Sequence, residues 1–167
     1  GSVRTISISK DAERILTGGA DGAIRIWDLK SQNGTSTRLL DGGGAVADFA
    51  FHPSKREVAF AIRKSDARSA AFTGNPRIEI RNLDTMELLR STYCHSDWLS
   101  TVAFSPDGKR LASGSLDKTV CVWEPLSLEK QYQFEAHSDP ISALDFLDED
   151  TLFSVDDGGY LCVWNCD

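Results

Sequence analysis

Ile24-Arg25-Ile26-Trp27, Val120-Cys121-Val122-Trp123 and Leu161-Cys162-Val163-Trp164 are three copies of one short alternating segment that runs into a tryptophan. A fourth copy, Ile78-Glu79-Ile80-Arg81, ends in arginine instead. The ends of the last three copies follow one another at intervals of 42 and 41 residues. A period of this length is typical of a repeated supersecondary unit, so we interpret the chain as four such units.

Short alternating runs separated by turn residues predict antiparallel strands within each unit. The third unit is the fullest, with predicted strands at 101–104, 110–113 and 119–123 and a further strand at 129–134. Matching runs occur in the first and fourth units, and stretches with helical periodicity are almost absent. The sequence therefore predicts an all-β protein.

The second unit departs from this pattern. About eleven extra residues, 65–75, lie between its second and third predicted strands, where we expect a solvent-exposed loop on one rim of the assembly. We predict one repeat domain over residues 1–167. Its unit boundaries are listed in chain order as approximately 3–28, 38–83, 87–124 and 129–165.

The composition narrows the class of protein. The chain has 167 residues, of which 41% are apolar and 26% charged, as in soluble folded domains. Its net charge is −7 and its basic residues are scattered, which argues against nucleic-acid binding because phosphate recognition needs a concentrated basic stripe. No run approaches the roughly 20 apolar residues of a membrane span, and no secretory signal opens the sequence. We expect neither nucleic acid nor membrane as a partner.

The sequence predicts no metal and no cofactor. Its four cysteines form no paired CxxC motif, and they are typical of small buried side chains in a reducing compartment, either cytoplasm or nucleus. The acidic stretch 145–157 lacks the ligand spacing of a calcium loop. The glycines at 42–44 lack the lysine and helix of a phosphate loop.

The ends of the repeats carry a family resemblance. Trp27-Asp28 is an intact Trp-Asp step, Trp123-Glu124 and Trp164-Asn165 are relaxed versions, and His95 and His137 precede the third and fourth units. In these features the chain resembles the WD-repeat family along essentially its whole length. The resemblance implies a β-propeller of about four blades, each an antiparallel four-stranded sheet, with the last blade incomplete or completed by another chain.

The resemblance also implies a chain of hydrogen bonds inside each blade. Its members are His95, Ser113, Asp117 and Trp123 in the third unit, Thr17, Asp21 and Trp27 in the first, and His137, Ser154 and Trp164 in the fourth. Gly158 stands where the fourth unit should have its Asp. A histidine, serine and aspartate also suggest a nucleophilic enzyme, but a catalytic centre is built once whereas these residues recur. We therefore predict a structural role and no catalytic residue.

Residues that differ between units are the candidates for recognition. In the family, one rim of the channel commonly receives peptides or partner domains. The positions that would face this rim are Arg4, Trp98, Ser100, Leu116, Ser142 and Asp157, and the insertion adds Arg68 and Phe72. Trp98 has the character of an interface hot spot, although packing against a neighbouring loop explains it equally well.

The predicted function is that of a non-catalytic scaffold for contact with a protein or peptide partner. The alternative is a ligand-sensing or regulatory propeller domain of a larger signalling protein. An open array of blades would also leave apolar end faces and an unpaired edge at Leu161–Trp164, which favours association. We expect the chain to be part of a longer propeller or to complete one by self-association.

Overall fold

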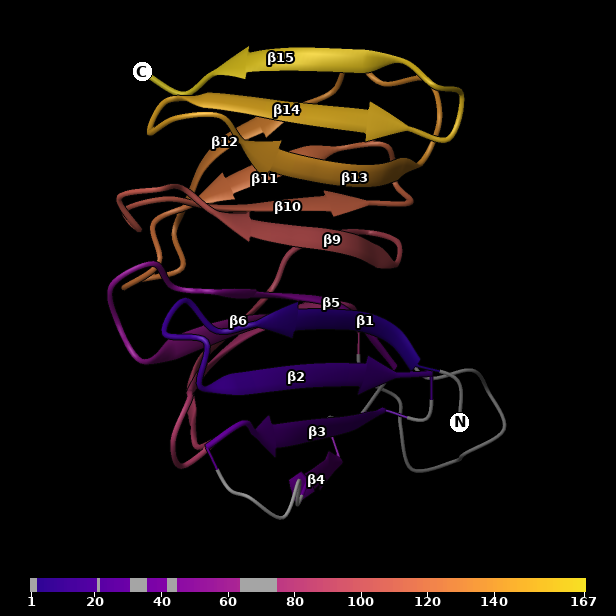
Figure 1. The fold of residues 1–167 in the computed structure, drawn as a ribbon. Helices are drawn as coiled ribbons and strands as arrows, with labels where there is room; N and C mark the ends of the chain where they lie inside the picture. Colours follow the sequence, from indigo (N-terminus) through magenta and orange to yellow (C-terminus); the bar gives the residue numbers. More distant parts are fainter. Residues whose placement is uncertain (1–2, 21, 31–35, 42–44, 64–74) are drawn as a thin grey trace.

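The computed structural model describes residues 3–20, 22–30, 36–41, 45–63 and 75–167. Fifteen strands and no helix are found in these ranges (Figure 1). The strands form four antiparallel sheets, and within each sheet neighbouring strands are also neighbours in the chain. The predicted all-β class and the β-propeller arrangement of blades are confirmed. The insertion at 65–75 lies, except for Asn75, outside the described residues.

We call the four sheets blades 1 to 4, in chain order. Blade 1 contains β1 (Val3–Ile8), β2 (Arg14–Gly19), β3 (Ala23–Asp28) and β4 (Ser36–Asp41). Blade 2 contains β5 (Val46–Phe51), β6 (Glu57–Ile62), β7 (Arg77–Asn82) and β8 (Leu88–Tyr93). Blade 3 contains β9 (Leu99–Phe104), β10 (Leu111–Ser115), β11 (Val120–Trp123) and β12 (Lys130–Phe134). Blade 4 has three described strands, β13 (Ile141–Phe146), β14 (Thr151–Asp156) and β15 (Leu161–Asn165).

The first strand of each blade lies against the first strand of the next, so β1, β5, β9 and β13 form the inner row. Residues from all four inner strands line one open pocket with a volume of about 590 Å³. We call the end of this row where the inner strands begin the leading rim, and the opposite end the trailing rim. The sequence units are offset from the blades by one strand, because each outer strand belongs to the preceding blade.

Apolar side chains fill the space between successive blades. Leu16, Ile24 and Phe60 are fully buried between blades 1 and 2, and comparable clusters lie at the other two junctions. Each fully buried aliphatic or aromatic side chain contributes roughly 1.5–3 kcal/mol to folding. A Cβ at Gly114 would lie 2.5 Å from Cγ2 of Ile141 in the next blade, so only glycine permits this close approach.

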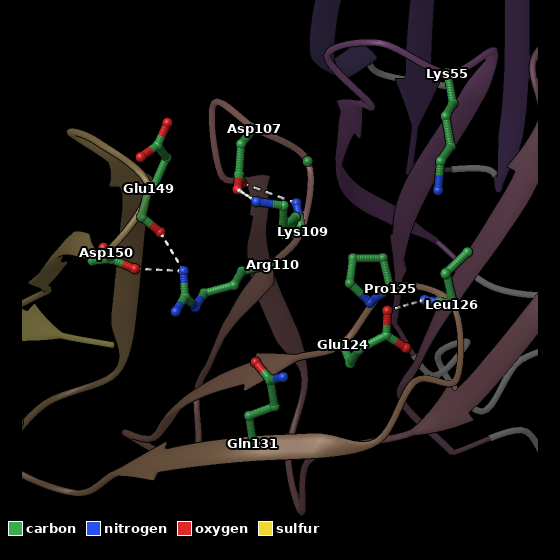
Figure 2. Close-up of a pocket in the computed structure, with 11 residues that line it drawn as sticks. Lys55, Asp107, Lys109, Arg110, Glu124, Pro125, Leu126, Gln131, Glu149 and Asp150 are labelled. Carbon is green, nitrogen blue, oxygen red and sulfur yellow. Dashed lines mark hydrogen bonds and ion pairs between the residues drawn. The ribbon is translucent and has the colours of Figure 1, made fainter. Parts of the chain in front are cut away.

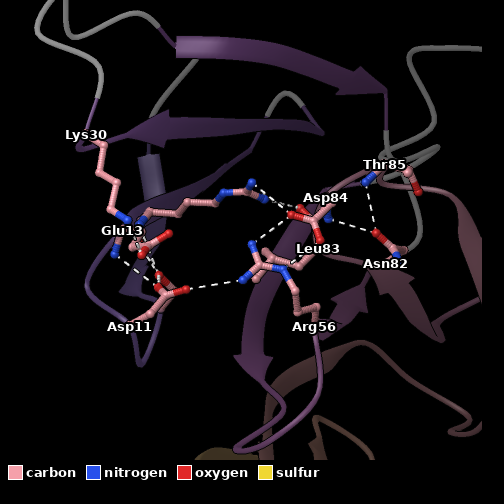
Figure 3. A network of polar contacts seen from close by, with 10 residues as sticks. Asp11, Glu13, Lys30, Arg56, Asn82, Leu83, Asp84 and Thr85 are labelled. Carbon is pink, nitrogen blue, oxygen red and sulfur yellow. Dashed lines mark hydrogen bonds and ion pairs between the residues drawn. The ribbon is translucent and has the colours of Figure 1, made fainter.

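Arginines cross each junction as well. On the trailing rim, Arg14 of blade 1 donates to the Leu83 carbonyl at 2.8 Å (Figure 3), and Arg110 of blade 3 donates to the Cys166 carbonyl at 2.8 Å. Blade 2 has Glu57 at the corresponding position, and Glu57 pairs with Arg90 of its own sheet. At this junction Arg63 instead reaches blade 3 on the leading rim.

A cleft of about 590 Å³ on the trailing rim accompanies this difference. Lys55 of blade 2 borders it on one side, and the turns that contain Asp107 and Glu124 border it on the other (Figure 2). Most charges in the cleft are satisfied locally: Lys109 pairs with Asp107, and Glu124 accepts hydrogen bonds from backbone amides.

Both ends of the array expose apolar side chains. Ile6 and Ile8 of β1 are 65% and 56% exposed, and Leu161 and Val163 of β15 are 60% and 56% exposed. By strand register, Ile6 and Ile8 lie on the face of blade 1 that, in blade 3, is buried against the preceding blade. The two exposed faces are therefore the two opposite halves of a blade junction.

Candidate partner-binding rim

The internal network of blade 3 joins the four residues that the resemblance implied. Trp123 Nε1 donates to Ser113 Oγ at 2.9 Å, and Ser113 Oγ lies 2.9 Å from His95 Nε2. His95 Nδ1 lies 3.0 Å from a carboxylate oxygen of Asp117. Because the Asp117 carboxylate can only accept, the His95 proton is assigned to Nδ1; Nε2 is then an acceptor, and it receives the Ser113 hydroxyl proton.

Asp117 anchors this network. Burial by itself would raise the pKa of the Asp117 carboxyl, but hydrogen bonds from His95 and Thr119 outweigh burial and hold this pKa well below its usual range. The same carboxylate accepts the backbone N–H groups of Ser96 and Thr119. It therefore joins the turn before β9 to the turn between β10 and β11, which are the two segments that shape the leading rim of blade 3.

Blade 4 repeats the network with one change that the sequence reading missed. Trp164 Nε1 donates to Ser154 Oγ at 2.7 Å, and His137 Nε2 lies 2.6 Å from the same oxygen. The carboxylate beside His137 Nδ1, at 2.9 Å, is that of Asp156. The position at which the repeat predicts this Asp is Gly158. Asp156 is two residues closer to the serine and substitutes because it ends β14 with its side chain buried.

Blades 1 and 2 depart further from this pattern. In blade 1, Trp27 Nε1 donates to Thr17 Oγ1 at 3.2 Å, and the predicted Asp21 lies outside the described residues. Blade 2 has no tryptophan. In its place Arg81 pairs with Glu79, which is 3% exposed and also pairs with Arg77.

The geometry of the networks does not suit nucleophilic catalysis. Ser113 and Ser154 are fully buried, and each hydroxyl oxygen is occupied by an indole N–H. Two of the cysteines are also poor nucleophiles, because burial raises the pKa of Cys94 to about 12 and that of Cys121 to about 11. These side chains hold the blades together.

Shifts in strand register near the start of each inner strand show where one group of the predicted rim residues lies. Each inner strand has a single extra residue opposite its neighbour, as a β-bulge produces, and the four extra residues are Arg4, Ala47, Ser100 and Ser142. A bulge redirects one side chain out of the alternation of its strand. The equivalence of these four positions makes the leading rim a repeated frame with a different side chain in each blade.

A second group lies where the second strand of each blade ends. Leu116 donates its backbone N–H to the Trp98 carbonyl, and Asp157 donates to the Pro140 carbonyl in the same way. Arg63 makes the corresponding bond to Ala45, so it is the blade 2 member of this group. Sequence reasoning missed Arg63, although its position directly after the apolar run of β6 was a usable signal.

Arg63 and Trp98 form the centre of the rim between blades 2 and 3. Arg63 Nε donates to the Leu99 carbonyl at 2.7 Å, and its Cζ lies 5.9 Å from the centroid of the Trp98 ring. Burial, and after it the nearby charge of Arg4, lowers the pKa of the Arg63 guanidinium. Cation–π contact of this kind fixes both side chains.

The structure brings only some of the predicted recognition residues together. Trp98, Ser100 and Leu116 share the rim of blade 3, and Arg4 approaches it from blade 1. Ser142 and Asp157 lie on the rim of blade 4, where the Ser142 hydroxyl donates to the Val155 carbonyl. Arg68 and Phe72 lie outside the described residues.

Neither a membrane span nor a metal site is present in the described ranges. No helix there is long and apolar enough to cross a membrane. No group of three or more His, Cys, Asp or Glu side chains in those ranges is arranged to hold a metal ion.

Comparison with known proteins identifies the class. The family model for the WD domain, G-beta repeat, matches residues 1–28, 86–124 and 128–165, which together are more than half of the chain. The chain therefore belongs to the WD-repeat family, whose members generally act as non-enzymatic scaffolds that bind protein partners. The matched segments leave out 29–85, the region with the altered second unit.

Individual relatives are much longer than this chain. The ciliary WD repeat-containing protein ctxp80 of Euplotoides octocarinatus is 28% identical over 84% of this chain and 21% of its own length. Apoptotic protease-activating factor 1 of Rattus norvegicus is 22% identical over 98% of this chain and 12% of its own length. The solved structure of U3-55K superimposes with a TM-score of 0.84 at 21% identity, over 98% of this chain and 49% of that chain.

Proposed function

We propose that this chain is a non-catalytic scaffold that binds a protein or peptide partner on its leading rim, with Trp98 as the principal contact. The observation that carries the proposal is the difference between the repeated network residues and the variable rim residues. The recurring polar side chains are buried and bonded to one another. The four bulge positions are instead equivalent places on the inner strands, and their surroundings differ from blade to blade.

The composition of the rim supports this proposal. Trp98 is half-buried with one ring face against Arg63, and Arg4 and Ser100 occupy bulge positions close by in the ring of inner strands. Tryptophan and arginine are the residue types that contribute most to binding at protein interfaces. An intracellular location, in cytoplasm or nucleus, fits the four cysteines without a disulfide.

The experiment is crosslinking mass spectrometry from a cell lysate with the wild-type chain and two variants. Trp98→Ala removes the proposed contact, and Leu126→Ala removes an exposed apolar side chain on the trailing rim as the matched control. We expect crosslinks that map to the leading rim to disappear in Trp98→Ala and to persist in Leu126→Ala. Equal crosslinking in all three proteins contradicts the choice of rim.

A second candidate is a regulatory propeller domain of a larger signalling protein. The relative that favours it is apoptotic protease-activating factor 1, which this chain matches over 98% of its length. The two candidates differ in what the rim contacts: a separate partner in the first case, and another domain of the same polypeptide in the second. Crosslinks from the rim to a segment of the parent polypeptide support the regulatory role.

Self-association through the exposed end faces is a separate proposal. Ile6 and Val163 lie on opposite halves of a blade junction, so two copies could join head to tail. Light scattering tests this directly. A monodisperse monomer at high micromolar concentration, unchanged in Ile6→Asp, counts against it.

A further inference from the structure

Each of the three blade junctions contains one arginine that bonds to the next blade, and the three arginines differ in their charge partners. Arg14 pairs with Asp84 at 2.9 Å, and Arg110 pairs with Asp150 at 2.6 Å. Within the described ranges, no carboxylate lies at ion-pair distance from Arg63. Among the described residues, the junction arginine on the leading rim therefore lacks the counter-charge that the two on the trailing rim have.

The atoms that Arg63 leaves available are the ones suited to a carboxylate. Its Nε is used by the Leu99 carbonyl, and its guanidinium plane is held near the Trp98 ring. Its two terminal nitrogens have no acceptor among the described residues. Such a pair of nitrogens donates two parallel hydrogen bonds to a carboxylate, and a guanidinium already fixed in place loses little entropy when it does so.

A second positive charge strengthens the argument. Arg4 lies close enough to lower the pKa of Arg63, after the larger effect of burial, and Arg4 also forms no ion pair within the described part of the chain. Two neighbouring guanidinium groups, one of them half-buried, are unfavourable without an anion. The chain as a whole has a net charge of −7, so this region of the rim contrasts with its surroundings.

The other polar groups beside Arg63 and Trp98 supply no counter-charge within the described residues. The Ser100 hydroxyl is buried and has no hydrogen-bond partner in the structure. Two acids near this rim already accept hydrogen bonds: Asp97 accepts the Trp98 N–H, while Asp48 accepts from Thr5 and Thr101.

We propose that the leading rim recognises an acidic peptide segment, in which an Asp or Glu side chain forms a bidentate ion pair with Arg63 and an adjacent apolar side chain packs on Trp98. This inference rests on the proposed function, because it specifies the chemistry of the partner at the same rim. It assigns Arg4 to long-range attraction of the acidic segment.

The test begins with selection of 12-residue peptides from a random phage-displayed library on the wild-type chain. Dissociation constants of the selected peptides are then measured by fluorescence anisotropy. We expect the peptides to share an Asp or Glu, and replacement of that residue by Asn or Gln to weaken binding about tenfold or more. Arg63→Gln should weaken binding by a similar factor, and combination of the two changes should add little.

Two controls keep folding separate from recognition. Arg56→Gln alters an exposed arginine on the trailing rim and should leave the dissociation constant unchanged. If Arg63→Gln lowers the melting temperature of the chain, the Asn or Gln substitutions in the peptide still decide the result, because they do not alter the protein.

Three outcomes overturn the inference. Peptides whose binding depends on Trp98 but not on an acidic residue or Arg63 contradict it and leave the proposed function standing. Peptides that bind independently of Trp98 contradict both. Finally, a double-mutant cycle in unfolding free energy that couples Arg63→Gln to Asp66→Asn assigns the counter-charge to the chain itself and excludes an acidic partner.

Discussion

Phe60, Glu79 and Arg81 of blade 2 occupy the strand positions that Ser113, Cys121 and Trp123 occupy in blade 3. In blade 3, Trp123 and Ser113 begin a hydrogen-bonded chain that continues through His95 and ends on Asp117, and Cys121 is buried beside it. In blade 2 a buried glutamate joins two arginines beside a fully buried phenylalanine. Both blades have the same four-stranded sheet. The polar groups that the two blades bury at these positions are bonded, and the shared sheet accommodates different sets of them, including Phe60 in place of Ser113.

The largest expected effect is on the ion pairs of blade 2. Glu79→Gln keeps the shape of the side chain but leaves Arg77 and Arg81 without their shared counter-charge, and loss of one partner of a buried pair typically costs about 3–5 kcal/mol. Glu57→Gln, at a more exposed pair with Arg90, is the control. Urea unfolding measures both. A loss below about 1 kcal/mol for Glu79→Gln would show that blade 2 does not depend on this charge.

The corresponding change in blade 3 is Ser113→Ala. It removes the partner of both His95 Nε2 and Trp123 Nε1, and we expect a loss of about 2 kcal/mol. Thr17→Val in blade 1 is the matched variant, because it removes the hydrogen-bond partner of Trp27 alone; Thr17 is buried, and Trp27 is only partly buried. We expect about 1 kcal/mol or less there. Equal losses in the two blades would argue against the extended network as the source of stability.

A smaller effect on stability is expected at the turns that follow the inner strands, where blade 2 differs from blades 1 and 3. Blades 1 and 3 have Ser9 and Ser105 there, whereas blade 2 has His52, whose Nδ1 accepts the backbone N–H groups of Ser54 and Lys55. Gly108, with a φ of 73°, lies so close that a Cβ would come within 2.4 Å of the His52 ring.

Burial, and then the charge of Lys55, lowers the pKa of His52 below its usual 6.5, with a smaller opposing effect from Glu57. The unfolded chain therefore binds more protons than the folded chain below about pH 6.5, and the unfolding free energy falls as the pH falls. His52→Ser, which restores the residue of blades 1 and 3, should reduce this pH dependence. Urea unfolding at pH 7.5, 6.5 and 5.5 measures the unfolding free energy of the wild-type chain and of His52→Ser. If the unfolding free energy changes equally with pH in both proteins, the dependence belongs to other groups.

The smallest effect is expected on the surface of the trailing rim. Asp84 accepts two hydrogen bonds from Arg56 and pairs with Arg14 (Figure 3), and these bonds, chiefly those from Arg56, lower the pKa of its carboxyl. Ion pairs exposed to solvent contribute roughly 0–1 kcal/mol. Asp84→Asn should therefore cost less than 1 kcal/mol, and 1 M salt should remove most of the difference. A larger, salt-independent loss would show that Arg14 depends on Asp84 for its bond to the Leu83 carbonyl.

The candidate site was only partly predictable. Arg4, Ser100 and Ser142 could be placed by their offset from each repeated strand, because the bulge recurs at the same offset in every blade. Arg63 was missed because the second unit was aligned around its insertion, and Asp156 was missed because a carboxylate two residues out of register reaches the same histidine. Alignment compares positions along the chain, whereas a hydrogen bond depends only on where the side-chain atoms lie.

The sequence by itself determined the all-β class and the repetition of one strand pattern, since alternation with a fixed period sets which side chains of a strand share a face. Only the tertiary structure decided which side chains meet across blades: Arg63 with Trp98, Arg14 with Asp84 and Asp48 with both of its neighbours. These residues are tens of positions apart, and their contact follows from the angle between packed sheets, which no local pattern encodes.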